Sequence, residues 1–303
     1  MATSTKISPP PWARLASIVD SGQNLLALMD TCEEPEVQEM IPTLGERAQS
    51  LYQGRTQQQY SGIAPYLIQM DRPLLQWMEK DLAGRPWGFF LIPKSFHKMA
   101  SIRKHFRRFL VVDDPDGKEL YFRFYDPRVI IGFLDCCTSE ELQQWMSPLR
   151  EILVPAADAW QQMVAPDPPD STSYSPYLRF QMTRRHFAAL QEQQIEQFVM
   201  QTIMRWRSRF PESFKALEVS TPNLSPLIHD AIDRAEKYGV IGEADVELFL
   251  DCICLLGNNF DHNGTFPWVE EILRETEIDG TIKMDQMHDR MVQIGILIET
   301  PDT

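Results

Sequence analysis

Most of the structural information in this chain lies in residues 85–128, RPWGFFLIPKSFHKMASIRKHFRRFLVVDDPDGKELYFRFYDPR. Residues 87–92 are a short apolar run closed by a proline, which is typical of a buried strand. Apolar residues recur at three- or four-residue steps over 95–108 and predict a helix. An Asp-Gly pair at 116–117 separates two strand-like runs, so we expect a β-hairpin over 109–125.

The flanking segments extend this pattern of strands and helices over residues 15–164. Residues 1–14 contain three consecutive prolines and predict a loose arm. Strands that alternate with helices predict a mixed α/β lobe, and a hairpin argues for a small mixed sheet over an all-parallel one. The expected elements are strands at 24–30, 49–52 and 64–71, helices at 34–40, 73–82, 127–134 and 138–146, a polar connector at 57–61, and a pair of edge strands at 151–154 and 159–164.

A change of composition marks the end of this lobe. Residues 165–176, APDPPDSTSYSP, contain four prolines among serine, threonine and aspartate, and predict an interdomain linker. The predicted fold class is therefore α+β, because a mixed α/β lobe is followed by an all-helical C-terminal lobe over 177–303. The helices expected in that lobe cover 183–209, 225–238, 243–256, 267–275 and 283–298.

The charge of the chain is negative and unevenly distributed. Its 303 residues carry a net charge of −14, which argues against a nucleic-acid partner. Residues 243–303 contain fourteen acidic and three basic residues, whereas residues 94–108 contain six basic and no acidic residues. No apolar run is long enough to span a membrane, and residues 1–15 lack the apolar core of a secretory signal. Because none of the five cysteines forms a CxxC pair, we expect free thiols and a cytoplasmic protein without a membrane partner.

The sequence contains none of the motifs of common enzymes and metal sites. HExxH, GxSxG, GxxxxGK[ST] and GxGxxG patterns are all missing. Cys252 and Cys254 lie in an apolar run and are expected in a core. Asp261 begins an Asp-His-Asn-Gly segment that lacks the later ligands of a calcium loop, and the hairpin aspartates are expected to cap turn amides. We therefore expect no enzyme activity, no metal and no cofactor.

The basic residues of 94–108 are the clearest candidate for a binding surface. Arg103 and Arg107 are four residues apart, as are Lys104 and Arg108, so two basic rows follow the predicted helix. Three interpretations stay open. The rows form a solvated face, a surface that docks onto the acidic helical end of the same chain, or a surface for an acidic or extended segment of a partner.

A series of short motifs resembles a known family. Over roughly residues 20–150 the series is similar to the adaptor-chaperones of bacterial type VI secretion systems, and the helical tail from Phe180 to Trp268 is also similar. The proline-rich residues 165–176 and the acidic segment beyond Lys283 depart from the family. The motifs are Asn24-Leu-Leu-Ala-Leu-Met-Asp30, Ala64-Pro-Tyr-Leu-Ile68, Arg85-Pro-Trp-Gly-Phe-Phe-Leu91, Phe106-Arg-Arg-Phe109, Asp116-Gly117 and Phe122-Arg-Phe-Tyr-Asp-Pro-Arg128.

The resemblance implies a non-enzymatic cytoplasmic protein that binds a cognate toxic effector and helps load it onto the VgrG-type spike of the secretion tube. On this basis the candidate partner-binding residues are Arg103, Arg107 and Arg108, with Tyr125 and Arg128 near a cleft between the lobes. An equally open alternative is that Arg128 caps a helix or pairs within the chain. A hydrolase with a dispersed site and an immunity-like protein that blocks a toxin are the alternative functions.

Overall fold

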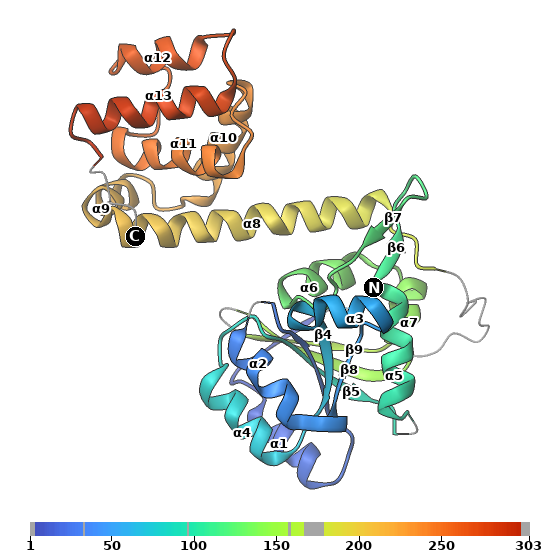
Figure 1. The fold of residues 1–303 in the computed structure, drawn as a ribbon. Coiled ribbons are helices and arrows are strands. Elements are labelled where there is room, and N and C mark those ends of the chain that lie inside the picture. Colours follow the sequence, from blue (N-terminus) through green and yellow to red (C-terminus); the bar gives the residue numbers. More distant parts are fainter. Residues whose placement is uncertain (1–3, 33, 96, 157–158, 167–178, 298–303) are drawn as a thin grey trace. The chain divides into compact units, whose positions relative to one another are not determined.

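The structure, a computed structural model, describes residues 4–32, 34–95, 97–156, 159–166 and 179–297. The chain divides into two units, residues 1–193 and 194–303. The first unit contains a seven-stranded sheet and a two-stranded sheet, and the second is helical in its described residues, so the predicted α+β class is confirmed (Figure 1). Within these described ranges, no helix has the length and apolar character needed to span a bilayer.

The large sheet is antiparallel, although a mixed sheet was the expectation from sequence. Its strand order is β1-β9-β8-β5-β2-β4-β3, and every neighbouring pair runs antiparallel. Helix α4 (Arg72–Asp81) connects β4 to β5, which run in the same direction, but β2 lies between them. The helix-linked strands are therefore not neighbours. The strands are β1 (Thr5–Ile7), β2 (Leu26–Asp30), β3 (Ala48–Ser50), β4 (Pro65–Gln69), β5 (Gly88–Pro93), β8 (Leu149–Pro155) and β9 (Trp160–Val164).

In the described part of residues 1–14, a strand and the start of a helix take the place of the expected loose arm. Strand β1 pairs with β9, and helix α1 (Trp12–Asp20) follows it. In α1, Trp12, Leu15 and Ile18 lie at three-residue steps and are buried, an amphipathic pattern that the preceding prolines obscure in the sequence. Because β1 takes the outer position, β9 is not an edge strand, and β8 lies between β5 and β9.

Helices cover both faces of β5, which explains its unbroken apolar sequence. Successive strand residues point to opposite faces, so Phe90 contacts Trp12 of α1 while Phe89 contacts Trp145 of α7 (Ser139–Met146). All six residues of β5 are buried. At Gly88, φ is +135° and a Cβ atom would lie 2.0 Å from a carbonyl oxygen of β2, so this close approach of the two strands requires glycine.

The helix and hairpin predicted after β5 are present as shorter elements. The helix is α5 (Met99–Phe106), and the hairpin strands β6 and β7 pair antiparallel. Asp114 accepts hydrogen bonds from the backbone N–H groups of Asp116 and Lys118 at 2.9 and 2.8 Å, which is the expected turn-capping role. The remaining elements here are β6 (Val111–Asp113), β7 (Glu119–Tyr121), α2 (Pro35–Met40), α6 (Pro127–Cys136) and α3 (Gly54–Tyr60), which replaces the expected polar connector.

The two units divide inside helix α8 (Arg184–Arg209), between Gln193 and Gln194, and not at residue 177. The physical reason is that Phe180 and Met182 are buried in the core of the first unit. Residues 167–176 of the predicted linker lie outside the described residues. The other helices are α9 (Pro211–Ser220), which was not expected, α10 (Ser225–Lys237), α11 (Glu243–Leu256), α12 (Pro267–Arg274) and α13 (Gly280–Gln293).

A buried lysine connects three helices of the second unit. Lys283 of α13 is 6% exposed, and its Nζ donates hydrogen bonds to the carbonyl oxygens of Tyr238 at 2.8 Å and Leu273 at 3.0 Å. These carbonyls lie at the C-terminal ends of α10 and α12. Because helix C-termini carry partial negative charge, a cation at this position stabilises both ends.

Candidate functional site

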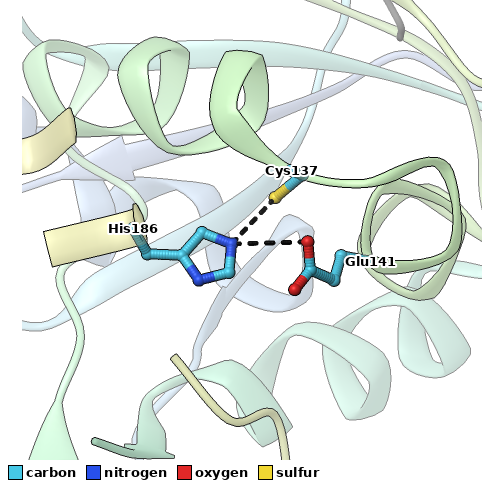
Figure 2. A group of neighbouring side chains, drawn as sticks. All are labelled: Cys137, Glu141 and His186. Carbon is cyan, nitrogen blue, oxygen red and sulfur yellow. Dashed lines mark hydrogen bonds and ion pairs between the residues drawn. The ribbon is translucent and has the colours of Figure 1, made fainter. Parts of the chain in front are cut away.

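A cysteine, a glutamate and a histidine lie together near the first turns of α7 and α8 (Figure 2). The Nε2 atom of His186 is 3.7 Å from Sγ of Cys137 and 3.5 Å from Oε2 of Glu141. Cys137 and His186 are buried. Side chains of these types form catalytic centres or metal sites in other proteins, and the geometry of the group decides between these roles.

The geometry of this group does not match a catalytic proton relay. In such a relay, one imidazole nitrogen faces the nucleophile and the other faces the carboxylate. Here Cys137 and Glu141 both face Nε2 of His186 (Figure 2). Burial also raises the pKa of the Cys137 thiol and lowers the pKa of His186, so both the thiolate and the imidazolium are disfavoured.

The hydrogen bonding of His186 argues against a metal ion at this position. A thiolate, a carboxylate and an imidazole are a donor set that zinc binds. However, the backbone N–H of Thr183 donates to Nδ1 of His186 at 2.9 Å, so Nδ1 carries no proton. The neutral ring must then carry its proton on Nε2, which is the nitrogen that a metal would need. The residues therefore do not fit a metal in this arrangement.

This group instead joins the N-termini of two helices. Thr138 and Glu141 form a capping box at the start of α7. Oε2 of Glu141 also accepts a hydrogen bond from Arg185 at 2.6 Å, in the first turn of α8. His186 accepts the N–H of Thr183 at the start of the same helix. The structural role of these side chains accounts for their burial and for their contacts.

One of the two predicted basic rows, that of Arg103 and Arg107, holds the end of strand β3. Arg103 donates from Nε to the carbonyl oxygen of Ser50 at 2.6 Å and from a terminal nitrogen to that of Tyr52 at 3.2 Å. Arg107 donates from Nε to the carbonyl oxygen of Leu51 at 2.8 Å. Because β3 is the outermost strand of the sheet, it has a strand neighbour on one side only. The two guanidinium groups therefore hold the chain where β3 ends, through the carbonyl oxygens of residues 50–52.

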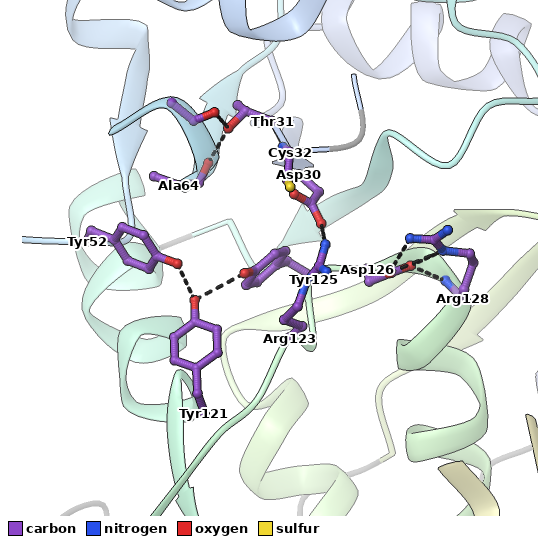
Figure 3. A network of polar contacts seen from close by, with 11 residues as sticks. Asp30, Thr31, Cys32, Tyr52, Ala64, Tyr121, Arg123, Tyr125, Asp126 and Arg128 are labelled. Atoms are coloured by element: carbon purple, nitrogen blue, oxygen red, sulfur yellow. Dashed lines mark hydrogen bonds and ion pairs between the residues drawn. The ribbon is translucent and has the colours of Figure 1, made fainter. Parts of the chain in front are cut away.

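Three tyrosine hydroxyls meet in the same unit (Figure 3), and one of them belongs to Tyr52, whose carbonyl oxygen accepts a hydrogen bond from Arg103. The hydroxyl of Tyr121 is 2.6 Å from that of Tyr52 and 3.1 Å from that of Tyr125. Tyr125 is only 2% exposed, whereas Tyr121 is 45% exposed, so Tyr121 presents the phenol ring of this group to the surface. Burial, followed by the hydrogen bonds with the other two tyrosines, raises the pKa of Tyr121, and its hydroxyl stays protonated.

A charged pair continues this group toward strand β2. Arg123 lies over the ring of Tyr125, 5.8 Å from its centroid, and donates a hydrogen bond to Oδ2 of Asp30 at 2.6 Å (Figure 3). Asp30 is fully buried, and burial raises its pKa although Arg123 opposes the shift. We call the connected set the arginine–tyrosine patch, and it consists of Tyr52, Arg103, Arg107, Tyr121, Arg123 and Tyr125.

The two remaining predicted residues have separate surroundings. Arg108 is half-buried, and its guanidinium lies 5.8 Å from the centre of the Phe109 ring. Arg128 forms a two-pronged contact with Asp126, with Nε–Oδ1 and terminal N–Oδ2 distances of 2.9 and 2.7 Å (Figure 3). Asp126 also accepts the backbone N–H of Arg128 at the start of α6. Arg128 therefore has the internal pairing that the sequence left open.

The sequence predictions omitted Tyr52, Tyr121 and Arg123. A signal for two of them exists, because Tyr121 and Arg123 alternate with Phe122 and Phe124, which are both buried. Tyr52 gives no such signal. Its role depends on a contact with a residue 69 positions away in the chain, which only the folded sheet brings close.

The fold and this geometry describe an α+β protein whose candidate site is a connected set of arginine and tyrosine side chains. Comparison with known families shows that residues 25–144 match a family described as "Domain of unknown function (DUF4123)". This match runs from the start of β2 into α7 and includes every residue of the arginine–tyrosine patch. Neither a curated protein nor a solved structure matches the chain.

Proposed function

We propose that this chain is a non-enzymatic adaptor-chaperone of a bacterial type VI secretion system. In the cytoplasm it binds a cognate toxic effector and helps load that effector onto the VgrG-type spike. The observation that carries this assignment is the family match over residues 25–144, within which the motifs that resemble such adaptors occur in order. Strands β2 to β5, the hairpin and the arginine–tyrosine patch all lie in that region.

The chemistry of the patch suits the recognition of a protein partner. Tyrosine and arginine are enriched at the centres of protein interfaces. Arg103 and Arg107 are already held by backbone carbonyl groups, so binding a partner costs them little further side-chain entropy. Tyr121 adds an exposed phenol, whose hydroxyl contacts that of Tyr52, the residue whose carbonyl oxygen Arg103 holds. An extended or acidic segment of the effector is therefore the partner that this surface fits best.

The arrangement of Cys137, Glu141 and His186 supports the non-enzymatic part of the assignment. Each of these side chains makes structural contacts near the start of α7 or α8, and Nε2 of His186, the ring nitrogen that faces Cys137, carries the ring proton and is not free to act as a base. In a hydrolase we would expect the two ring nitrogens of the histidine to face the nucleophile and the carboxylate separately.

Co-expression with the effector encoded beside this chain is the direct test. Affinity-tagged full-length protein should retain the effector at moderate salt and should then transfer it to, or hold it with, the spike protein. If the effector is absent from the purified material, the adaptor assignment is wrong. Protection of cells by this chain against the free toxin, without any complex with the spike, would indicate an immunity-like protein instead.

Charge substitutions can locate the binding surface without disturbing β3. Reversal of Arg103 or Arg107 would remove hydrogen bonds to the backbone, so the exposed lysines of the same segment are better probes. We expect Lys98→Glu combined with Lys104→Glu to weaken effector retention about tenfold. The matched control is Lys6→Glu combined with Lys80→Glu, which makes the same change in net charge on exposed positions elsewhere in the unit. Equal retention by both double variants would exclude the basic segment as the site.

A further inference from the structure

The second unit contains a groove of about 650 Å³ between helices α12 and α13. Trp268 and Ile272, one turn apart on α12, form its apolar side. The side chains of Asp289 and Arg290 line it from α13. A groove between two neighbouring helices is a shape into which the apolar face of a third helix fits.

The packing of the core leaves part of the groove's apolar side exposed. On α12, Val269 and Leu273 are the buried residues, with exposed fractions of 0% and 1%. Trp268 and Ile272 are only half-buried. The tryptophan ring and the isoleucine therefore present apolar surface inside the groove, which a partner could bury with a gain in free energy.

The charged side chains around this apolar surface are mainly acidic. Glu271 and Asp289 line the groove and are exposed, and for Glu271 the described residues include no ion-pair partner. Arg290 donates its hydrogen bond to Gln293 of its own helix. The segment from 243 to 303 contains fourteen acidic and three basic residues, so the part of the chain that forms the groove carries a strongly negative net charge.

We infer that this groove binds a cationic amphipathic helical segment of a partner protein. An arginine or lysine of that segment would lie over the ring of Trp268, because the face of an indole ring attracts cations. Glu271 and Asp289 would then supply the opposite charge, and Ile272 would contact the apolar face of the incoming helix. These residues lie outside 25–144, so the inference is independent of the family match and of the proposed function.

Binding of a defined peptide to the full-length protein tests this inference. The probe is a fluorescently labelled peptide of about 16 residues, with leucines at helical spacing and arginines at the other positions. One comparison peptide has glutamate in place of arginine, and another has the same composition without helical spacing. In fluorescence anisotropy we expect binding of the first peptide only. Equal binding of the glutamate peptide or of the shuffled peptide would overturn the inference.

Two charge-matched double variants separate a specific site from general attraction. Glu271→Lys with Asp289→Lys should weaken peptide binding at least about tenfold. Asp233→Lys with Glu236→Lys changes the net charge equally on exposed positions of α10 and should change the affinity by less than about twofold. An equal loss in both would show that the peptide senses net charge only. Trp268→Leu, which keeps an apolar residue, should weaken binding to the arginine peptide, and unchanged affinity would exclude the cation–ring contact.

Discussion

The buried histidine of helix α5 should make the stability of the first unit depend on pH. His105 is 8% exposed, lies against the rings of Phe106 and Phe109, and has its Nε2 atom 2.8 Å from the carbonyl oxygen of Trp145. Burial lowers its pKa from the usual 6.5 to about 4, although the hydrogen bond to Trp145 opposes this shift. The perturbation of interest is a fall in pH from 7 to 5.

The sign and the size of the effect follow from these two pKa values. Between pH 6.5 and about 4, the unfolded chain binds a proton at this histidine and the folded chain does not. The contribution of His105 to the free energy of unfolding is therefore fully present above pH 6.5 and is lost as the pH falls toward 4. The loss attributable to His105 is about 2 kcal/mol between pH 7 and pH 5, and about 3 kcal/mol below pH 4.

Urea unfolding at a series of pH values measures this loss. Tryptophan fluorescence reports mainly on the first unit, because five of the seven tryptophans lie in residues 1–193. His105→Gln keeps a donor for the carbonyl of Trp145 but cannot titrate. The contributions of all other ionisable groups to the pH dependence are shared by both proteins and cancel in the difference between wild type and variant. The difference between their unfolding free energies should change by about 2 kcal/mol from pH 7 to pH 5. Parallel pH profiles of wild type and His105→Gln would refute the reasoning.

Three further substitutions probe other buried features, each measured by equilibrium unfolding of the full chain. Lys283→Met should destabilise the second unit by about 3 kcal/mol, because two helix-terminal carbonyl groups lose a charged donor; an unchanged transition would show that water replaces the amine. Gly88→Ala should cost about 3 kcal/mol or prevent folding, since its Cβ would lie 2.0 Å from the carbonyl oxygen of Leu28. Arg123→Met should destabilise the first unit by about 3 kcal/mol at neutral pH by leaving Asp30 buried without its partner, and stability equal to wild type would contradict that dependence.

The sequence was sufficient for the central strands and for most helices, because their local patterns are strong. β5 was recognisable from an unbroken apolar run, and α7 from Thr138 followed three residues later by Glu141. The antiparallel sheet was not predictable in the same way. Local periodicity identifies a strand but does not show which strands become neighbours. Because α4 connects β4 to β5 along the chain, the sequence does not indicate that β2 lies between them in the sheet.

The candidate site was only partly predictable for a similar physical reason. A spacing of four residues correctly places Arg103 and Arg107 on the same helical face. It does not show whether that face meets solvent, a partner or another part of the chain. The answer depends on the end of β3 and the residues after it, whose carbonyl groups come from more than fifty positions earlier in the sequence. The tyrosine hydroxyl contacts likewise depend on segments that meet only after folding.

The arginines of the patch connect stability to recognition. Arg103 and Arg107 hold the end of an edge strand through backbone carbonyl groups, and one of these carbonyls belongs to Tyr52, whose hydroxyl contacts that of the exposed Tyr121. A substitution of either arginine therefore changes the fold and the candidate binding surface together, and lost capture alone would not identify a contact residue. Lys98 and Lys104 share the charge of this segment and are exposed, so their reversal changes the electrostatic surface without removing the support of β3. If recognition depends on charge, Lys98→Glu combined with Lys104→Glu will weaken effector retention, whereas the unfolding transition of the first unit will not change.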